Sequence, residues 1–134
     1  MVVIKEQVVP LRSGEDVVRT RQLVRECSIK LGFSLVQQTK MVTAASELAR
    51  NTLAHGRGGE MKVEQLSDGG RQALRLTFVD NGPGIPDIPQ ALTDGFTTAG
   101  GMGLGLGGAK RLVDEFDISS TVGKGTRVSI LRWA

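Results

Sequence analysis

Residues 74–84 read Leu-Arg-Leu-Thr-Phe-Val-Asp-Asn-Gly-Pro-Gly, and this segment is the most informative about the fold. Its first part alternates apolar and polar residues, which predicts a β-strand with one buried face. A second alternating segment, beginning with Met61 and Val63, precedes it, and the turn-forming residues 67–70 separate the two. The pattern therefore predicts a β-hairpin that ends at Asp80, where a turn-rich, glycine-rich run replaces the strand.

The segments before this hairpin predict one strand and two helices. Residues 2–11 are rich in β-branched residues and predict a strand. A helical spacing of apolar residues then runs from Ser13 to Gly32. Ser34 opens a second helix that ends at Gly56, with Gln37 placed to complete a capping box.

The segments after the hairpin predict a helix and a second hairpin. The glycine-rich residues 95–108 lead into a helix, and closing strands follow at about residues 118–122 and 126–133. The apolar side of this helix consists of Ala109, Leu112, Val113 and Phe116. Helices interspersed with adjacent hairpins predict an α+β two-layer sandwich, with a mostly antiparallel mixed sheet and helices on one face. We expect a single domain over residues 1–134.

Composition narrows the classes of function. The 17 Lys and Arg residues against 14 Asp and Glu residues give a net charge of +3, spread along the chain with few aromatic residues. This balance argues against a nucleic-acid partner and favours a solvated surface of mixed charge. A single cysteine, Cys27, the lack of an apolar run of ~18 residues and the absence of a signal-peptide pattern predict a cytoplasmic protein without a membrane partner.

Three polar residues share one face of the second predicted helix. Glu47, Asn51 and His55 are spaced four residues apart, so their side chains project in the same direction. One interpretation is a polar edge on an amphipathic helix, with His55 placed near the helix C-terminus as a partner of its dipole. The other is a carboxylate and an amide directed into a pocket, with Glu47 as a general base and Asn51 as an oxygen ligand for Mg²⁺.

Asp80 also has two interpretations. Its run of turn-forming residues is typical of an ordinary reversal. However, Gly82 and Gly84 remove side chains directly after the carboxylate, which lets a planar ligand approach the backbone. An aspartate at a strand end can accept a hydrogen bond from an exocyclic amine such as that of adenine.

The glycine-rich segment at residues 95–108 holds seven of the 18 glycines. One of them is Gly95, and the other six lie from Gly100 to Gly108. It contains a formal G-x-G-x-x-G, but no strand precedes it within a βαβ unit, and the G-K-[ST] ending of a Walker A motif is missing. Glycines that alternate with Met102 and Leu104 before a helix favour a backbone phosphate cradle over a flexible linker. In the turn at residues 123–126, Thr126 is a candidate hydroxyl contact to a ligand.

Four of these elements, in this order, resemble the GHKL (Bergerat-fold) ATP-binding superfamily. The Glu47-x-x-x-Asn51 pair resembles its N box, and Asp80-x-Gly82-x-Gly84 resembles its first glycine box. Residues 101–105, Gly-Met-Gly-Leu-Gly, resemble the second glycine box, and Gly125-Thr126 matches the last motif. Within the superfamily, residues 80–87, 94–98 and 107–116 are similar to the small anti-sigma regulatory serine/threonine kinases of the RsbT type.

The resemblance implies a role for each matched residue. Asp80 would hold adenine, Asn51 would ligate Mg²⁺, and Glu47 would deprotonate the acceptor hydroxyl. The glycine loop would close over the triphosphate of ATP. The residues implied to contact the nucleotide are Asn51, His55, Asp80, Gly82, Gly84, Ile85, Thr97, Thr98, Gly100, Gly101, Met102, Gly103, Leu104, Gly105 and Thr126.

The same resemblance implies an ATP-dependent serine/threonine kinase of a bacterial stress-response partner-switching pathway. Its substrate would be a STAS-domain antagonist protein, and its further partner a phosphatase or a sigma factor. The alternative is a nucleotide-gated anti-sigma or phosphatase-binding module with little or no kinase activity. Residues 97–99 stand where anti-sigma factors of the longer-lidded type carry an arginine, so no residue is assigned to the γ-phosphate. The oligomeric state stays open.

Overall fold

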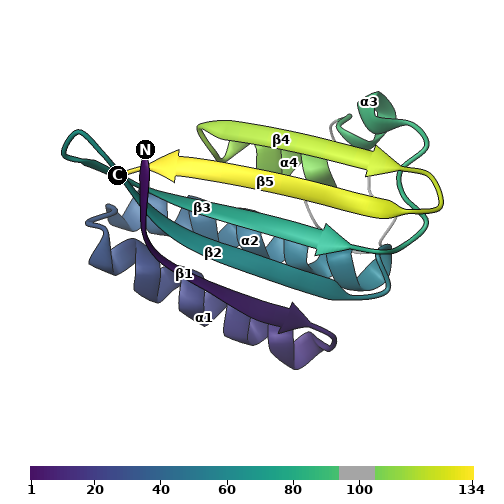
Figure 1. The fold of residues 1–134 in the computed structure, drawn as a ribbon, viewed down its shortest axis with the longest axis horizontal. Coiled ribbons are helices and arrows are strands. Elements are labelled where there is room, and N and C mark those ends of the chain that lie inside the picture. The colour runs from purple at the N-terminus through teal and green to yellow at the C-terminus, as the bar shows by residue number, and fades with distance from the viewer. Residues whose placement is uncertain (94–104) are drawn as a thin grey trace.

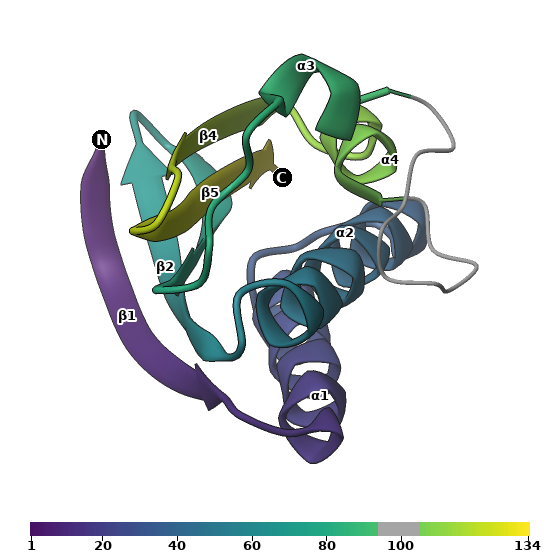
Figure 2. The same ribbon diagram turned by 90° about the vertical axis from the view of Figure 1, so that its right-hand side faces the viewer.

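The computed structural model describes residues 1–93 and 105–134. Within this part of the chain, five strands form one antiparallel sheet in the order β1-β2-β3-β5-β4 (Figure 1). Turning the molecule by 90° shows that the helices lie together on one face of this sheet (Figure 2). The elements along the chain are β1 (Val2–Leu11), α1 (Gly14–Lys30), α2 (Leu35–Ala54), β2 (Gly59–Asp68), β3 (Arg71–Asp80), α3 (Ile88–Ala91), α4 (Gly105–Arg111), β4 (Glu115–Thr121) and β5 (Gly125–Trp133).

The predicted α+β sandwich is confirmed, and so is the hairpin from which the prediction started. β2 and β3 pair from Gly59↔Asp80 to Asp68↔Arg71 without a register shift. This hairpin lies in the middle of the sheet because β1 pairs with its first strand and β5 with its second. Asp80 is consequently brought to the end of a central strand, beside the C-terminus of α2.

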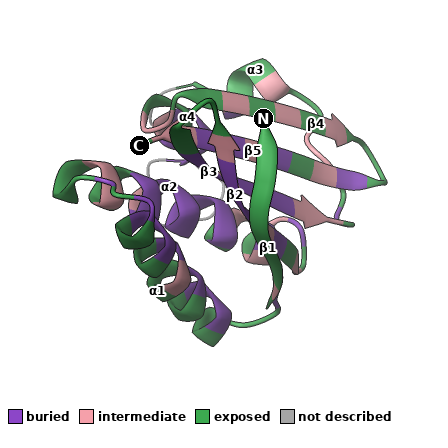
Figure 3. Ribbon diagram, turned by 60° about the vertical axis from the view of Figure 1, so that its left-hand side comes forward, coloured by how far each residue is buried: buried purple, intermediate pink, exposed green. Residues whose placement is uncertain are grey.

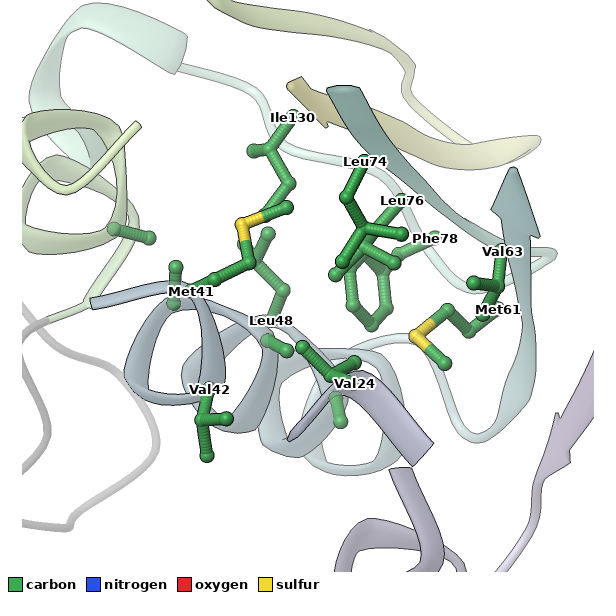
Figure 4. Packing of buried hydrophobic residues seen from close by; sticks show 14 of the residues in the cluster. Val24, Met41, Val42, Leu48, Met61, Val63, Leu74, Leu76, Phe78 and Ile130 are labelled. Atoms are coloured by element: carbon green, nitrogen blue, oxygen red, sulfur yellow. The ribbon is translucent and has the colours of Figure 1, made fainter. Parts of the chain in front are cut away.

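The core fills the space between the sheet and α2. Leu74, Leu76 and Phe78 of β3 are buried on the helix-facing side of the sheet, opposite Met41 and Leu48 of α2 (Figure 4). β1 is the exception to this burial, since it is exposed over most of its length at the edge of the sheet (Figure 3). Packing against the sheet therefore fixes α2, the helix that carries the candidate polar residues.

Both long helices begin where the sequence predicts. Ser34 accepts a hydrogen bond from the backbone N–H of Gln37, whose side chain returns one to Ser34. Ser13 occupies the corresponding position before α1, with Asp16 accepting from the Ser13 backbone. These capping interactions satisfy N–H groups that the first helical turn leaves without partners.

The segment after the glycine-rich stretch differs from the prediction. The predicted helix extended over Leu112, Val113 and Phe116, but α4 ends at Arg111 and β4 begins at Glu115 rather than at residue 118. Asp114 donates its backbone N–H to Leu131, and Phe116 lies opposite Ile130 in the sheet. Pairing with β5 thus overrides the helical spacing, because Phe116 and Ile118 fit the alternation of a strand equally well. The short α3, with Asp87 at its N-cap, was not predicted either.

Candidate functional site

A cavity of about 470 Å³ opens beside the C-terminal half of α2. Its walls come from the end of β3, the loop before α3, the first residues of α4 and the start of β5, which are far apart in the sequence. The residues that line it are Leu48, Asn51, Thr52, Ala54, His55, Gly56, Arg57, Phe78, Asp80, Pro83, Gly84, Ile85, Pro86, Asp87, Gln90, Ala91, Gly105, Leu106, Thr126 and Val128. The mixture of apolar walls with a few polar groups is typical of a small-molecule site.

Asp80 is held at the wall of the cavity by backbone donors. Its Oδ1 accepts hydrogen bonds from the N–H of Gly82 at 2.9 Å and from the N–H of Thr126 at 3.2 Å. Its Oδ2 accepts no hydrogen bond from any residue that the structure describes. The carboxylate is therefore fixed in place while one oxygen stays available to a ligand.

Two glycines make room for Asp80, one beside its side chain and one beside its backbone. A Cβ at Gly56 would overlap the side chain of Asp80, and a Cβ at Gly125 would overlap its backbone carbonyl. Gly125 also has a φ of +119°, a backbone conformation that other residues rarely adopt. The sequence indicated Gly56 only as the end of a helix, so its contact with Asp80 is a finding of the structure.

Asn51 and Glu47 occupy different surroundings although they lie one helical turn apart. Asn51 lines the cavity, and its side chain makes no hydrogen bond to the described residues. Glu47 is buried, with 8% of its surface exposed, and is not among the residues that line the cavity. Its Oε1 accepts from Arg50 Nη1 at 2.8 Å, and its Oε2 accepts from the N–H of Gly105 at 3.4 Å. In this structure, both carboxylate oxygens of the predicted base are engaged.

A hydroxyl network connects Asp80 to the loop before α3. Thr126, which donates its N–H to Asp80, lies with its Oγ1 2.8 Å from Ser120 Oγ. Ser120 in turn accepts the N–H of Ile85 at 2.7 Å. Ser120 was not among the predicted site residues, because its alternating strand offers no motif by which the sequence could single it out.

The structure brings most of the described candidates together. Seven of them line the cavity, namely Asn51, His55, Asp80, Gly84, Ile85, Gly105 and Thr126. Gly82 and Glu47 do not line the cavity but contact residues that do. Gly82 donates its N–H to Asp80, and Glu47 accepts the N–H of Gly105. The other candidates, Thr97, Thr98, Gly100, Gly101, Met102, Gly103 and Leu104, lie outside the described residues.

Comparison with known families identifies the class of protein. Residues 36–133 match the model of the histidine kinase-, DNA gyrase B- and HSP90-like ATPases, and the chain belongs to this family. The cavity with Asp80 and Asn51 lies within the matched residues. ATP is accordingly the nucleotide that this class of protein uses.

Comparison with individual proteins narrows the class to protein kinases. The chain is 46% identical to the serine/threonine-protein kinase RsbT of Bacillus subtilis over 88% of its own length and 89% of that relative. It is 33% identical to the anti-sigma F factor of Geobacillus kaustophilus, over 74% of this chain and 71% of the relative. With the family's ATPase domain, the first of these similarities makes the protein an enzyme of the serine/threonine-protein kinase type.

A solved structure shares the fold. The RsbU and RsbW domains of a Mycobacterium tuberculosis protein superpose on 96% of this chain with a TM-score of 0.66 at 19% identity. The chain spans 32% of that longer structure. In the part of the chain that the structure describes, no helix combines the length and apolar character needed to span a membrane.

Proposed function

We propose that the protein transfers the γ-phosphate of Mg-ATP to a serine or threonine of a STAS-domain antagonist in a bacterial partner-switching pathway of the stress response, in the cytoplasm. The observation that carries the proposal is one cavity lined by both Asp80 and Asn51, with Glu47 one turn from Asn51 on the same helix. Sequence similarity to RsbT and to an anti-sigma F factor supports a role in partner switching.

The polar groups of the cavity suit the two ends of ATP. Adenine would lie against Asp80 and Thr126, which both line the cavity and come from the neighbouring strands β3 and β5. Asn51 would bind Mg²⁺ through its side-chain oxygen. Among the described residues, no three His, Cys, Asp or Glu side chains gather into a metal site. A single amide ligand from the protein suits Mg²⁺, because this ion keeps several waters and is held largely by phosphate oxygens.

Glu47 would act as the base for the acceptor hydroxyl. Its carboxylate would take the proton while the hydroxyl oxygen bonds to the γ-phosphorus, and the bond between that phosphorus and the β–γ bridging oxygen breaks to release ADP. Glu47 and Asn51 lie four residues apart on α2, or about 6 Å along the helix axis. With Mg²⁺ held by Asn51, this spacing would put the Glu47 carboxylate near the phosphate end of the nucleotide.

Transfer of labelled γ-phosphate from Mg-ATP to a purified STAS-domain protein tests the proposal. We expect Glu47→Gln to slow transfer by about 10²- to 10⁴-fold, the usual contribution of a general base, with ATP affinity retained. Glu26→Gln, an exposed position on α1, is the matched control and should transfer at the normal rate. Unchanged transfer by Glu47→Gln would remove Glu47 from the role of base.

The second candidate function is a nucleotide-gated binding module that captures a sigma factor or a phosphatase. The observation that favours it is that Glu47 does not line the cavity. Both of its carboxylate oxygens already accept hydrogen bonds, one from Arg50 and one from Gly105. Capture of the partner should then depend on ATP but not on Glu47. Undiminished, ATP-dependent capture by Glu47→Gln together with no transfer by the unmodified protein would establish this module in place of the kinase reaction.

A further inference from the structure

Ser120 of β4 makes three polar contacts through one hydroxyl group. Its Oγ accepts the backbone N–H of Ile85 at 2.7 Å, lies 3.1 Å from the carbonyl oxygen of Gly125, and lies 2.8 Å from Thr126 Oγ1. The first partner can only donate and the second can only accept. The third, a hydroxyl, can do either, so the direction of its hydrogen bond is decided by the other two.

Counting protons assigns that direction. A serine hydroxyl has one hydrogen to donate and two lone pairs with which to accept. Its hydrogen satisfies the Gly125 carbonyl, and one lone pair receives the N–H of Ile85. The remaining lone pair faces Thr126, which must therefore donate its own hydroxyl hydrogen to Ser120. This is the only arrangement of the network in which all three contacts are hydrogen bonds.

The direction of this hydrogen bond determines what Thr126 can offer to a ligand, because Thr126 lines the cavity and Ser120 does not. With its hydrogen turned toward Ser120, the Thr126 hydroxyl has only lone pairs left for a ligand. Asp80 likewise offers only acceptors, and its Oδ1 already receives two backbone N–H groups. The base end of the cavity therefore combines two acceptors and no side-chain donor from this pair of residues.

We propose that Ser120 is a specificity-determining positioning residue, which makes Thr126 an acceptor and so favours a purine with an amino group at position six over one with a carbonyl there. This inference rests on the placement of the nucleotide base beside Asp80 and Thr126 in the proposed function. An amino group donates two hydrogens to such a site, whereas a carbonyl oxygen would meet only lone pairs. A site that cannot satisfy a ligand's polar group discriminates strongly against that ligand.

Affinities for ATP and inosine triphosphate test the inference, because the two nucleotides differ only at position six and in the hydrogen that the inosine base carries on the neighbouring N1. In Ser120→Ala the Thr126 hydrogen loses its acceptor and becomes free to turn into the cavity. We expect the preference for ATP over inosine triphosphate to fall by about tenfold, the effect of one relieved hydrogen-bond mismatch. Ser120→Thr keeps the hydroxyl and should keep the preference.

A double-mutant comparison separates this role from simple loosening of the loop. Thr126→Val removes the hydroxyl, so adding Ser120→Ala to it should change the preference no further. Equal weakening of both nucleotides in Ser120→Ala, with their ratio unchanged, would overturn the inference. If ATP affinity is instead normal in Asp80→Asn, the placement of the base itself is wrong, and the proposed function fails at that point rather than at Ser120.

Discussion

Gly56 lies against Asp80 at the wall of the cavity, and its lack of a side chain is what lets that carboxylate take its position. A Cβ at this residue would overlap the Cβ and Cγ of Asp80. We therefore expect Gly56→Ala to displace the carboxylate and to weaken ATP binding at least tenfold in a calorimetric titration. Gly14→Ala is the matched control, because a Cβ there meets nothing within 4 Å. Equal affinity in the two variants would contradict this role of Gly56.

How far single residues can be predicted from sequence depends on whether their chemistry is local. Asp80 and Asn51 were predicted because each stands in a short motif whose spacing indicates a ligand, and both line the cavity. Ser120 and Gly56 were not, because their roles come from contacts 35 and 24 residues away in the chain, with Ile85 and Asp80. Such contacts exist only once the sheet has formed.

The β2–β3 hairpin carries an ion pair across its two strands. Arg75 binds both oxygens of Glu64, through Nε at 2.9 Å and Nη2 at 3.1 Å. The Glu64 side chain is 7% exposed and that of Arg75 is 35% exposed. Hydrogen bonding from Arg75 holds the pKa of Glu64 below its ordinary value of 4.5. Folding therefore favours the ionised carboxylate.

This pKa gives the hairpin a pH-dependent contribution to stability. Because the folded pKa is lowered, the contribution is present above pH 4.5 and is lost as the pH falls through the lowered value. We expect Arg75→Met to reduce the free energy of unfolding by about 1–2 kcal/mol at neutral pH, allowing for partial exposure of the arginine. Urea denaturation at pH 7 and about pH 3 measures the difference, which should shrink at the lower pH.

A control for this prediction is available on the same sheet. Arg127 lies 3.8 Å from Asp117, and their side chains are 52% and 78% exposed. Arg127→Met should change stability by less than about 0.5 kcal/mol, since exposed ion pairs contribute little. A loss as large as that of Arg75→Met, or a loss in Arg75→Met that does not depend on pH, would contradict the account.

Helices and strands can be predicted from sequence where their signals are local. The capping pattern at Ser34 and the alternation in β3 are local signals, and both elements formed where expected. The boundary between α4 and β4 was wrong because Phe116 suits either element by spacing. Its place is decided by pairing with Ile130 of β5, a contact that no local pattern contains.

The cavity joins elements from most of the chain, namely α2, β3, α3, α4 and β5. A ligand that binds all of these elements binds only the folded state, so it must raise the stability of the whole chain. At a concentration one hundred times its dissociation constant, a ligand adds about 2.7 kcal/mol. For a chain of this length that corresponds to a rise in Tm of about 10 °C.

We therefore expect saturating ATP with Mg²⁺ to raise Tm by roughly this amount, measured by calorimetry with and without the metal. At the same nucleotide concentration, Asp80→Asn should lose most of the rise, because the base end of the cavity loses its carboxylate. Asn51→Ala should keep the part seen without metal and lose the increment due to Mg²⁺, since only the proposed metal ligand is removed. If Asp80→Asn shows the normal rise in Tm, adenine does not bind against Asp80. A metal increment retained by Asn51→Ala would mean that phosphate and water alone hold the magnesium, and the two ends of the cavity are thereby tested separately.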